Sequence, residues 1–327
     1  MNRRDAATVV LALAIAVPPF IASAQPAAKL VRIGFLAPGS PGQGGASNQV
    51  IQRLNELGYV EGKNAVIERR FDDRMPERLP ALAAELVLAK VDVIVAITNL
   101  CGFAAKEATR TIPIVVWGAH GALETGLVAS LARPGGNITG VESLAPEVDM
   151  KRVQLLREIV PGLARVAALY DAGDQGSPAH LKYTRDAGRI MKVDVSTLEV
   201  RRPADFDPIL ASAIGKSLGS LLVYTSILTY ESWPKIAAFA QQNRLPTMCE
   251  FKQMARAGCL VSYGPPFDEF SQRVAKQVDR ILRGSPPGDL PIEQPTKFEL
   301  AINLKTARAL GLTIPPNVLL RADEVIE

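Results

Sequence analysis

The sequence predicts an α/β protein made of two lobes, each a doubly wound parallel sheet with helices on both faces. From residue 31 onward, short runs rich in β-branched residues alternate with amphipathic helical stretches, which is the pattern of βαβ units. The strand-like runs are apolar at nearly every position, as expected for parallel strands covered on both faces. A single hydrophobic core stops growing near roughly 250–300 residues. The 327 residues of this chain therefore favour two lobes.

The first half of the chain alternates expected helices with expected strands. One helix carries Val50, Leu54 and Leu57 at helical spacing. Gly58 ends this helix, and Pro76 begins the next one. A third helix is expected over about 100–110, and the strands of this half over 31–36, 65–71, 91–97, 112–117 and 138–141.

The second half repeats the plan of the first. A helix with a stripe of Met150, Val153 and Leu156 begins it. Near its end, a long helix over about 267–283 leads into a connection rich in Pro and Gly over 284–295, and a last strand–helix pair covers 298–310. The strands expected in this half span 165–170, 193–200, 220–225, 246–249 and 260–263.

The composition is that of an ordinary soluble protein. The chain is 48% apolar and 21% charged, which excludes collagen-like, coiled-coil and disordered classes. Its 37 basic and 33 acidic residues give a net charge of +4, and the basic residues are scattered. No nucleic-acid partner is expected, because binding to nucleic acid requires a clustered basic surface.

The first 24 residues predict a cleaved export signal. Arg3 and Arg4 give a positive start, residues 6–17 are apolar, and residues 22–24 form an A-x-A cleavage site. The prolines at 18–19 interrupt the apolar run, which stays below the ~20 residues that a membrane-spanning helix needs. We therefore expect cleavage between Ala24 and Gln25, no membrane anchor, and a mature protein outside the cytoplasm.

The three cysteines have two interpretations. Cys101 follows an expected strand, Cys249 ends another, and Cys259 begins the next strand ten residues later. An oxidising compartment allows a Cys249–Cys259 disulfide if those strands are neighbours, since the two Cα atoms must lie within about 7 Å of each other. The alternative is three small buried thiols.

Catalytic and cofactor motifs are missing from the sequence. The chain has two histidines and contains no HExxH, CxxC or GxSxG motif, so zinc sites and Ser-His-Asp arrangements are disfavoured. The glycine-rich stretch 38–45 follows the first strand, but Ser47 stands where a dinucleotide-binding fingerprint needs its third glycine. We expect no metal and no cofactor, and a protein that binds a molecule rather than transforms one.

The topology predicts where a ligand binds. In doubly wound sheets ligands lie beyond the carboxyl ends of the strands, and the space between two facing lobes is the default site. The residues at these strand ends are the candidate ligand-binding set: Ser40, Pro41, Thr98, Asn99, Trp117 and Gly118 in the first lobe, and Tyr170, Asp171, Tyr224, Thr225, Ser226, Glu250 and Tyr263 in the second.

Each type of side chain in this set has an expected role. Thr98 or Asn99 can cap the helix that follows them, and the free N–H groups at a helix start suit a carboxylate. The aromatic residues either sandwich a flat apolar ligand or pack one lobe on the other. Asp171 and Glu250 pair with a ligand ammonium or with neighbouring Lys and Arg side chains. His120, beside the cleft, is expected to be a loop histidine rather than a ligand contact.

Several segments resemble a known family. They are residues 54–64 (LNELGYVEGKN), 76–87 (PERLPALAAELV), 125–140 (TGLVASLARPGGNITG) and 295–316, which runs into 320–326 (LRADEVI). Together they are similar to ABC-transporter substrate-binding proteins of the tryptophan/tyrosine-binding type. The resemblance implies a type I periplasmic binding protein fold with three crossovers between the lobes. It places lobe 1 at 30–143 with 265–292, and lobe 2 at 144–264 with 293–327.

The resemblance also implies a function. It indicates a monomeric periplasmic receptor that closes on a small solute and delivers it to the permease and ATPase of an importer. Where the family commonly has Asp-Pro-Val-Gly-Thr-Gly, this chain has Gly-Ala-Leu-Glu-Thr-Gly at 121–126. The displaced acid favours a carboxylate over an ammonium as the anchored end of an amino acid or of an aromatic or small carboxylate. The alternatives are a ligand sensor, or an extracytoplasmic hydrolase that uses Glu124, Glu250 or Cys101.

Overall fold

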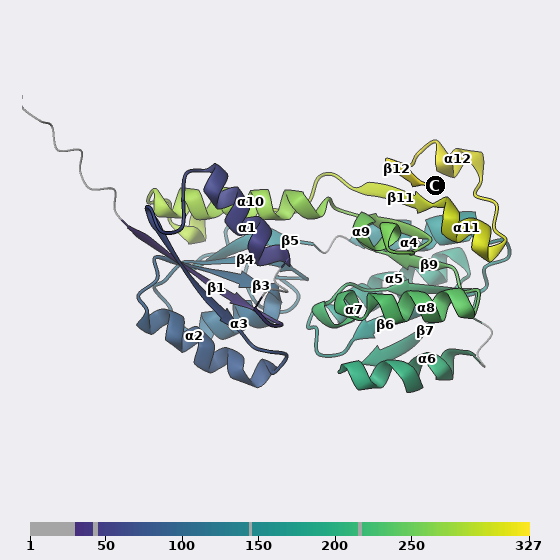
Figure 1. The fold of residues 1–327 in the computed structure, drawn as a ribbon, viewed down its shortest axis with the longest axis horizontal. Helices are drawn as coiled ribbons and strands as arrows, with labels where there is room; N and C mark the ends of the chain where they lie inside the picture. Colours follow the sequence, from purple (N-terminus) through teal and green to yellow (C-terminus); the bar gives the residue numbers. More distant parts are fainter. Residues whose placement is uncertain (1–29, 42–44, 144–145, 215–217) are drawn as a thin grey trace, which may run out of the picture.

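Two lobes lie side by side along the long axis of the molecule (Figure 1). The computed structural model describes residues 30–41, 45–143, 146–214 and 218–327, so the expected export signal lies outside the described residues. The sheet of the first lobe has the order β2-β1-β3-β4-β5, and its described pairings are parallel. Its strands are β1 (Val31–Ala37), β2 (Ala65–Phe71), β3 (Val93–Ile97), β4 (Ile114–Ala119) and β5 (Ile138–Glu142).

Helices cover both faces of the first sheet, which explains why its strands are apolar on successive positions. Phe35 and Val95 pack under α1 (Gly45–Glu56) and α10 (Phe267–Leu282) on one face. Leu36 and Ile94 point to the other face, into a core shared with α2 (Leu79–Leu88) and α3 (Thr98–Ala108). A short 3-10 helix, η1 (Pro76–Arg78), precedes α2.

The second sheet has the order β12-β11-β10-β9-β8-β6-β7. Its described pairings are parallel except for the antiparallel pair of β10 and β11. The strands are β6 (Arg165–Asp171), β7 (Asp194–Val200), β8 (Ser220–Val223), β9 (Thr247–Cys249), β10 (Val261–Gly264), β11 (Glu299–Asn303) and β12 (Glu324–Ile326).

The second sheet is also covered on both faces. One core includes residues of α4 (Pro146–Ile159), α5 (Ser177–Met191), α11 (Leu304–Leu310) and α12 (Pro316–Leu319). The other includes residues of α6 (Phe206–Ile214), α8 (Trp233–Gln242) and α9 (Lys252–Arg256). The remaining elements of the second half are α7 (Ile227–Glu231), η2 (Pro203–Asp205) and η3 (Pro287–Asp289). The two-lobed, doubly wound α/β architecture predicted from the sequence is confirmed.

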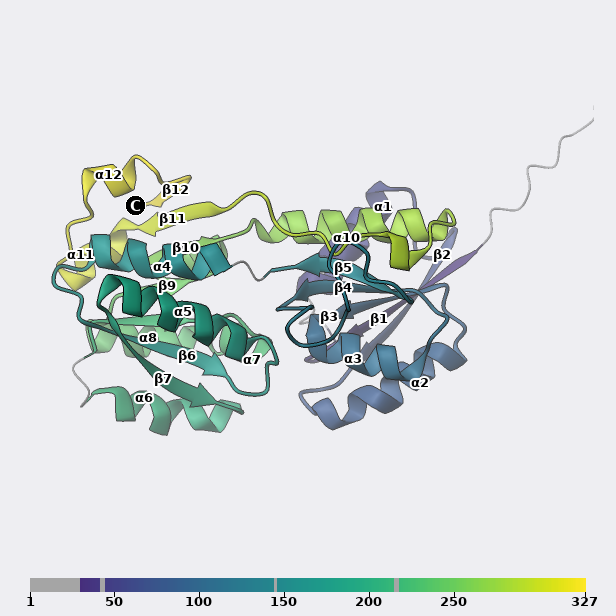
Figure 2. The same cartoon turned by 180° about the vertical axis from the view of Figure 1, so that it is seen from behind.

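The chain passes between the sheets after β5, after β10 and again after η3. The second passage carries the chain from β10 into α10, which lies over the first sheet in both views (Figures 1 and 2). The third passage runs beside β5, where the Glu293 N–H donates to the Gly140 carbonyl at 2.9 Å and the Glu142 N–H donates to the Glu293 carbonyl at 2.9 Å. Residues 144–145 of the first passage lie outside the described residues.

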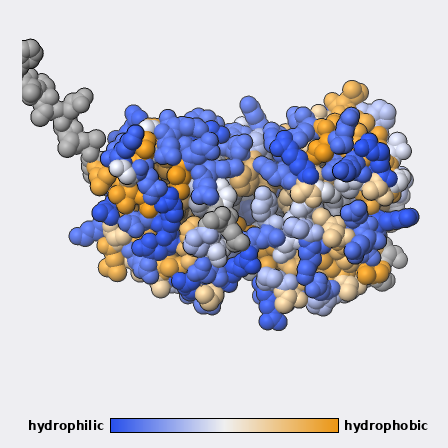
Figure 3. Space-filling view, in the orientation of Figure 1, coloured by the Kyte–Doolittle hydropathy of each residue, from blue (hydrophilic) through white to orange (hydrophobic). Residues whose placement is uncertain are grey.

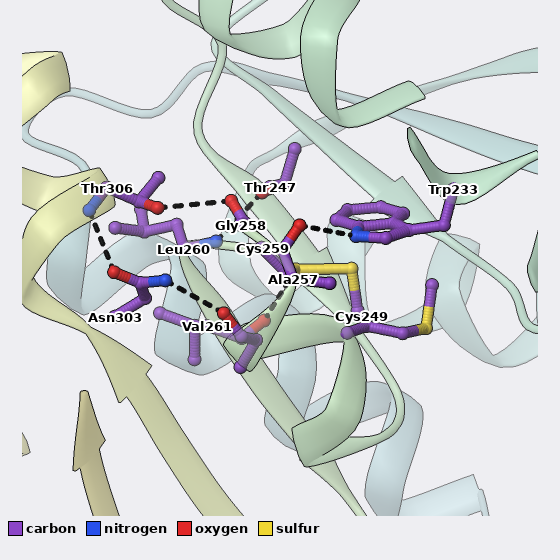
Figure 4. The surroundings of a disulfide bond; sticks show 12 residues. Trp233, Thr247, Cys249, Ala257, Gly258, Cys259, Leu260, Val261, Asn303 and Thr306 are labelled. Carbon is purple, nitrogen blue, oxygen red and sulfur yellow. Dashed lines mark hydrogen bonds between the residues drawn. A yellow bond between two sulfur atoms is a disulfide. The ribbon is translucent and has the colours of Figure 1, made fainter. Parts of the chain in front are cut away.

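A disulfide joins Cys249, the last residue of β9, to Cys259, which precedes β10, with 6.5 Å between the Cα atoms. The surrounding segment is fixed by side-chain hydrogen bonds (Figure 4): the Trp233 indole N–H donates to the Ala257 carbonyl at 2.9 Å, and the Leu260 N–H donates to the Thr247 hydroxyl at 2.9 Å. Cys101 is a buried free thiol. Among the described residues, no helix combines the length and the apolar character needed to cross a membrane.

Candidate functional site

Loops at the carboxyl ends of the two sheets meet across the junction between the lobes. After β4, His120 Nδ1 lies 3.4 Å from Asp174 Oδ2, which follows β6. On one side of this contact, Arg74 pairs with Glu231 of α7 at 2.6 Å. Each contact joins a residue of the first lobe to one of the second, so the lobes are closed on each other.

A third cross-lobe contact runs from Tyr183 on α5 to Glu124, whose Oε1 accepts the tyrosine hydroxyl at 3.3 Å. On the face drawn in Figure 3, hydrophilic and intermediate residues predominate along the junction, and hydrophobic patches lie over the two lobes. Polar loops rather than an apolar seam therefore hold the closed arrangement.

Behind these contacts, the second lobe holds a buried network of charged side chains. Asp149 is fully buried, and its carboxylate accepts from Arg152 Nη1 at 3.0 Å and contacts His180 Nδ1 at 2.7 Å. Arg152 also donates from Nε to the Tyr263 carbonyl at 2.8 Å. Its Nη2 lies 3.7 Å from Glu250 Oε1. Burying a charged side chain destabilises a protein unless the charge has a partner. In this network Asp149, Arg152 and His180 have hydrogen-bond partners.

His120 is the charged contribution of the first lobe. Burial disfavours the imidazolium, but the Asp174 carboxylate, helped by Glu250 and Glu142, outweighs burial and raises the pKa of His120 to about 9. Burial likewise disfavours the Asp174 carboxylate, but His120 outweighs it and lowers the pKa of Asp174. The His120 ring also stands edge-on to the His180 ring, with 5.4 Å between their centroids. His120 is therefore a charged link between the lobes, and it lies in the loop after β4, as expected.

Glu142, the last residue of β5, is a buried acid of the first lobe. It is 2% exposed, and its Oε1 accepts the Ala122 N–H at 2.9 Å. Burial raises the pKa of its carboxyl group. Glu142 and Glu250 both act on the charge of His120, so acids from both lobes face the same histidine.

Two of the predicted first-lobe residues, Thr98 and Asn99, lie at the start of α3. Neither side chain caps the helix, whose N-cap is Ile97 without a side-chain hydrogen bond, so the predicted capping role was wrong. Asn99 instead holds the loop after β4, donating to the His120 carbonyl at 2.7 Å and accepting its N–H at 3.0 Å. Thr98 is partly exposed with a φ of 78°, a left-handed conformation that is rare for β-branched residues.

The Trp117 side chain turns into the core of the first lobe. Its indole N–H donates to the Ser271 hydroxyl on α10 at 3.1 Å, and its ring contacts Phe267 and Phe270 at centroid distances of 5.0 and 5.5 Å. The next residue, Gly118, has a φ of 66° and open space where a Cβ would lie. Of the remaining predicted pair, Ser40 is half-buried and Pro41 is exposed.

The predicted aromatic residues of the second lobe are also engaged locally. The Tyr170 hydroxyl donates to Glu199 at 2.9 Å. The Tyr224 hydroxyl donates to Thr184 at 2.8 Å, and its ring lies 5.0 Å from that of His180. Tyr263 stacks on Phe298 at 5.9 Å.

The predicted polar residues of the second lobe lie in its strand-end loops. Asp171 accepts the Gly173 N–H at 2.8 Å, and burial raises the pKa of its carboxyl group. Ser226 caps α7 by accepting the Thr229 N–H at 3.2 Å, and the Thr225 hydroxyl contacts the Met254 sulfur at 3.7 Å. Of the predicted set, the structure places Glu250 within the buried charged network.

The strand-end rule missed the charges that helices and loops contribute. Asp149 and Arg152 are spaced i, i+3 on α4, within an otherwise apolar stripe. Two opposite charges at that spacing on a buried helix face indicate a buried ion pair, and the sequence alone could have shown this. Asp174 lies three residues past the end of β6, and His120 lies one residue past the end of β4. A search that covers three residues beyond each strand end would have included both Asp174 and His120.

An open groove of about 580 Å³ also lies between α6 and α8, lined by residues that include Leu210, Ile214 and Phe239. Its lining comes from two helices that cover one face of the second sheet. The groove brings together no residue of the predicted ligand-binding set.

Residues 40–326 match the family model described as ABC transporter substrate binding protein. A tyrosine-binding protein from Clostridioides difficile (strain R20291) is 25% identical over 267 residues, which is 82% of this chain and 76% of that protein.

Two solved structures share the fold. An ABC domain in complex with L-Trp from Streptococcus pneumonia superposes with a TM-score of 0.83 at 22% identity, covering 90% of this chain and 99% of that one. The ligand-free, open structure of a substrate binding protein from Clostridium difficile gives a TM-score of 0.66 at 21% identity, again covering 90% and 99%. The fold is that of type I periplasmic binding proteins, and the chain belongs to the family of ABC transporter substrate-binding proteins.

Proposed function

We propose that this chain is the extracytoplasmic receptor of an ABC importer, which captures an amino acid or a small or aromatic carboxylate between its lobes and delivers it to a permease and its ATPase. The observation that carries the proposal is the meeting of charged side chains from both lobes: partly buried His120 and buried Glu142 from one, and partly buried Asp174 and buried Glu250 from the other. Buried charges destabilise a protein unless they are balanced. Charged side chains that meet between two lobes able to separate are expected where a polar solute binds.

The mechanism that this geometry supports is a population shift. A solute that contacts both lobes stabilises only the closed arrangement, and so moves the equilibrium toward it. The better superposition on the L-Trp complex than on the open structure, at nearly equal identity and coverage, supports the view that the arrangement described is the closed one. The three passages between the sheets are the hinge in this proposal, with lobe 1 at 30–143 and 265–292 and lobe 2 at 144–264 and 293–327.

The binding role is favoured over the hydrolase alternative by the state of the candidate reactive groups. Burial raises the pKa of the Cys101 thiol well above its ordinary value, and a nucleophilic cysteine needs the opposite shift. Glu124 is exposed and accepts from Tyr183, and Glu250 is held beside Arg152. None of these three has a described neighbour that activates a water or a hydroxyl.

The location and assembly state are part of the same proposal. The mature protein is a periplasmic monomer that begins at Gln25. Amino-terminal sequencing of the exported protein checks the cleavage, and detection of Met1 on that protein contradicts it. Light scattering coupled to gel filtration checks the monomer.

The direct test of the receptor role is release of the native solute. Protein purified from its own host without refolding is denatured, and the released small molecules are identified by mass spectrometry. The identified compound is then added back to solute-free protein. At a hundredfold excess over the dissociation constant we expect the free energy of unfolding to rise by about 2.7 kcal/mol, which raises the melting temperature. The proposal fails if no small molecule is released and a panel of amino acids and organic acids leaves the thermal stability unchanged.

A further inference from the structure

We propose that Arg273 of α10 is a positioning residue that sets the affinity of the receptor from outside the binding site. It holds residues 293–296 of the third passage on lobe 1, which confines the rotation in that passage to the chain around Lys297. This inference rests on the proposed receptor function. It moves residues 293–296 from lobe 2, where the resemblance places them, to lobe 1.

The third passage begins as an extended segment attached to the first lobe. Leu290 and Ile292 are buried in the two cores of that lobe. Glu293 continues the segment and forms a parallel bridge with Val141 of β5. The chain is therefore still bound to the first sheet at the residue where lobe 2 was expected to begin.

The Arg273 side chain extends this attachment beyond the bridge. Its Nη1 donates to Glu293 Oε2 at 2.9 Å, and its Nη2 donates to the Thr296 hydroxyl at 3.2 Å. Its Nε donates to Glu269, one turn earlier on α10, at 3.0 Å, so the helix itself orients the guanidinium. The Arg273 and Glu293 side chains are only 22% and 27% exposed, and partly buried ion pairs are screened less by salt than exposed ones.

Gln277, one turn further along α10, contributes to the same attachment. It is 1% exposed, and its Nε2 donates to the carbonyls of Gly140 and Pro291 at 3.1 and 3.2 Å and to Glu293 Oε1 at 3.3 Å. Both oxygens of the Glu293 carboxylate thus accept from α10. Because α10 packs on the sheet of the first lobe, the third passage moves with that lobe as far as Thr296.

The second lobe holds the chain again two residues later. Phe298 stacks on Tyr263 of β10, with 5.9 Å between the ring centroids, and Glu299 begins β11. Lys297, between the two attachments, is exposed. The third passage can therefore turn freely only around Lys297.

The second passage runs beside this point. It consists of Pro265 and Pro266, between the end of β10 and the start of α10. Pro265 lines a small hollow over α10 together with Pro295 of the third passage and Arg273. Arg273 thus lies where two of the three passages are neighbours, so that one side chain can affect the hinge.

Release of the attachment should favour the open state. In the closed state the cross-lobe contacts of His120, Arg74 and Tyr183 fix both lobes, and with them both ends of the third passage. The open state lacks these contacts, so a passage freed from residue 293 onward gains more backbone conformations there than in the closed state. Because the solute binds to the closed state, a smaller closed fraction lowers the apparent affinity for every solute by the same factor.

Hydrogen–deuterium exchange of the solute-free mature protein tests the attachment without any ligand. We expect Arg273→Gln to accelerate exchange about tenfold in peptides covering 290–299, because hydrogen bonds of a charged group are lost there. Arg283→Gln is the matched control, since Arg283 forms an ion pair with Asp279 on the same helix at 2.8 Å, about three turns further along. Unchanged exchange over 290–299 in Arg273→Gln overturns the inference.

Calorimetry tests the effect on affinity with L-tyrosine, L-leucine and 3-(4-hydroxyphenyl)propanoate. We expect Arg273→Gln to weaken binding of each compound that binds by the same factor, about three- to tenfold. Arg273→Lys keeps the charge but loses the forked donors, so its affinity should lie between those of Arg273→Gln and the wild type, whereas Arg283→Gln should bind as the wild type does. Wild-type affinity in Arg273→Gln overturns the inference, and so does a loss confined to one of several compounds that bind.

A second variant separates the contact from the fold. Glu293→Gln should weaken binding in the same direction as Arg273→Gln, and the double variant should bind no more weakly than the weaker single variant, because both changes remove one contact. Additive losses overturn the assignment to this contact. Failure of every compound and of the released native solute to bind overturns the receptor function and the effect on affinity with it, while the exchange experiment still decides the attachment.

Discussion

A single methyl group at Gly176 should prevent the lobes from closing. Gly176 precedes α5 in the second lobe, and a Cβ added there would lie 2.0 Å from His120 Cβ and 2.9 Å from His120 Cγ of the first lobe. Carbon atoms in ordinary contact are about 3.5–4.0 Å apart, so Gly176→Ala requires the lobes to separate by roughly 1.5–2 Å at this point. The backbone of Gly176 has a φ of −80°, which alanine adopts without strain, so the isolated second lobe should fold normally.

The size of the effect follows from the position of the clash. The opposing atom is the Cβ of His120, which cannot move without the backbone of its loop, and Asn99 holds that loop at both its N–H and its carbonyl. Overpacking of this kind destabilises by about 1–3 kcal/mol. Because it applies to the closed state alone, solute affinity should fall roughly 5- to 150-fold.

Calorimetric titration with the solute released from the native protein measures this loss, and small-angle X-ray scattering reports the fraction of closed molecules. Gly45→Ala is the matched control, because a Cβ at Gly45 meets no atom within 4 Å. Wild-type affinity in Gly176→Ala would refute the reasoning that the closed arrangement described is the one that binds.

Three further outcomes are expected. Because the pKa of His120 is raised from its ordinary 6.5 to about 9 in the closed form, its contribution to closure is complete below about pH 6.5 and is lost as the pH rises through about 9. Solute affinity should therefore fall between about pH 7 and about pH 9.5. In His120→Gln the histidine titration is absent, and any titration of the solute itself remains, so the fall in affinity should be smaller. Replacing Cys249 and Cys259 by alanine should lower the free energy of unfolding by about 2–3 kcal/mol in urea titrations, since the disulfide closes a loop with a sequence separation of 10, and an unchanged value contradicts the bond. Arg74→Ala removes a partly exposed ion pair with Glu231, so stopped-flow dissociation should accelerate by no more than about fivefold, and a much larger change would show that this contact, rather than the buried cluster, controls release.

The order of strands and helices could be predicted because it depends on local patterns. Apolar runs such as 91–97 and 31–36 become β3 and β1, and the stripe through Val50 and Leu54 becomes the buried side of α1. The antiparallel pairing of β11 with β10 has no such local signal, because strand direction follows from the third passage between the lobes. Local patterns therefore specify the elements but not every neighbour.

The side-chain directions at strand ends could not be predicted in the same way. Both faces of each sheet are apolar, so nothing local shows that Trp117 turns toward α10. His120 lies one residue past β4, and its inward position depends on the hydrogen bonds that Asn99 makes with its backbone. Contacts between residues distant in the sequence determine both outcomes.

The charged network lies mostly beyond the reach of sequence patterns. Glu250 could be predicted because it stands directly after β9, at the edge where ligands bind in such sheets. Arg152 joins it from α4, and only the packing of that helix against the second sheet brings the two side chains to within 3.7 Å. The partner of a buried charge is thus a property of the folded chain.

Hydrogen–deuterium exchange with and without the released native solute tests most directly whether the solute binds between the lobes. A solute held there should slow exchange in peptides covering 118–126 of the first lobe and 171–183 of the second at the same time, because the cross-lobe contacts of His120 and Tyr183 lie in these segments. Slower exchange in only one lobe, or around the groove between α6 and α8, would contradict binding between the lobes.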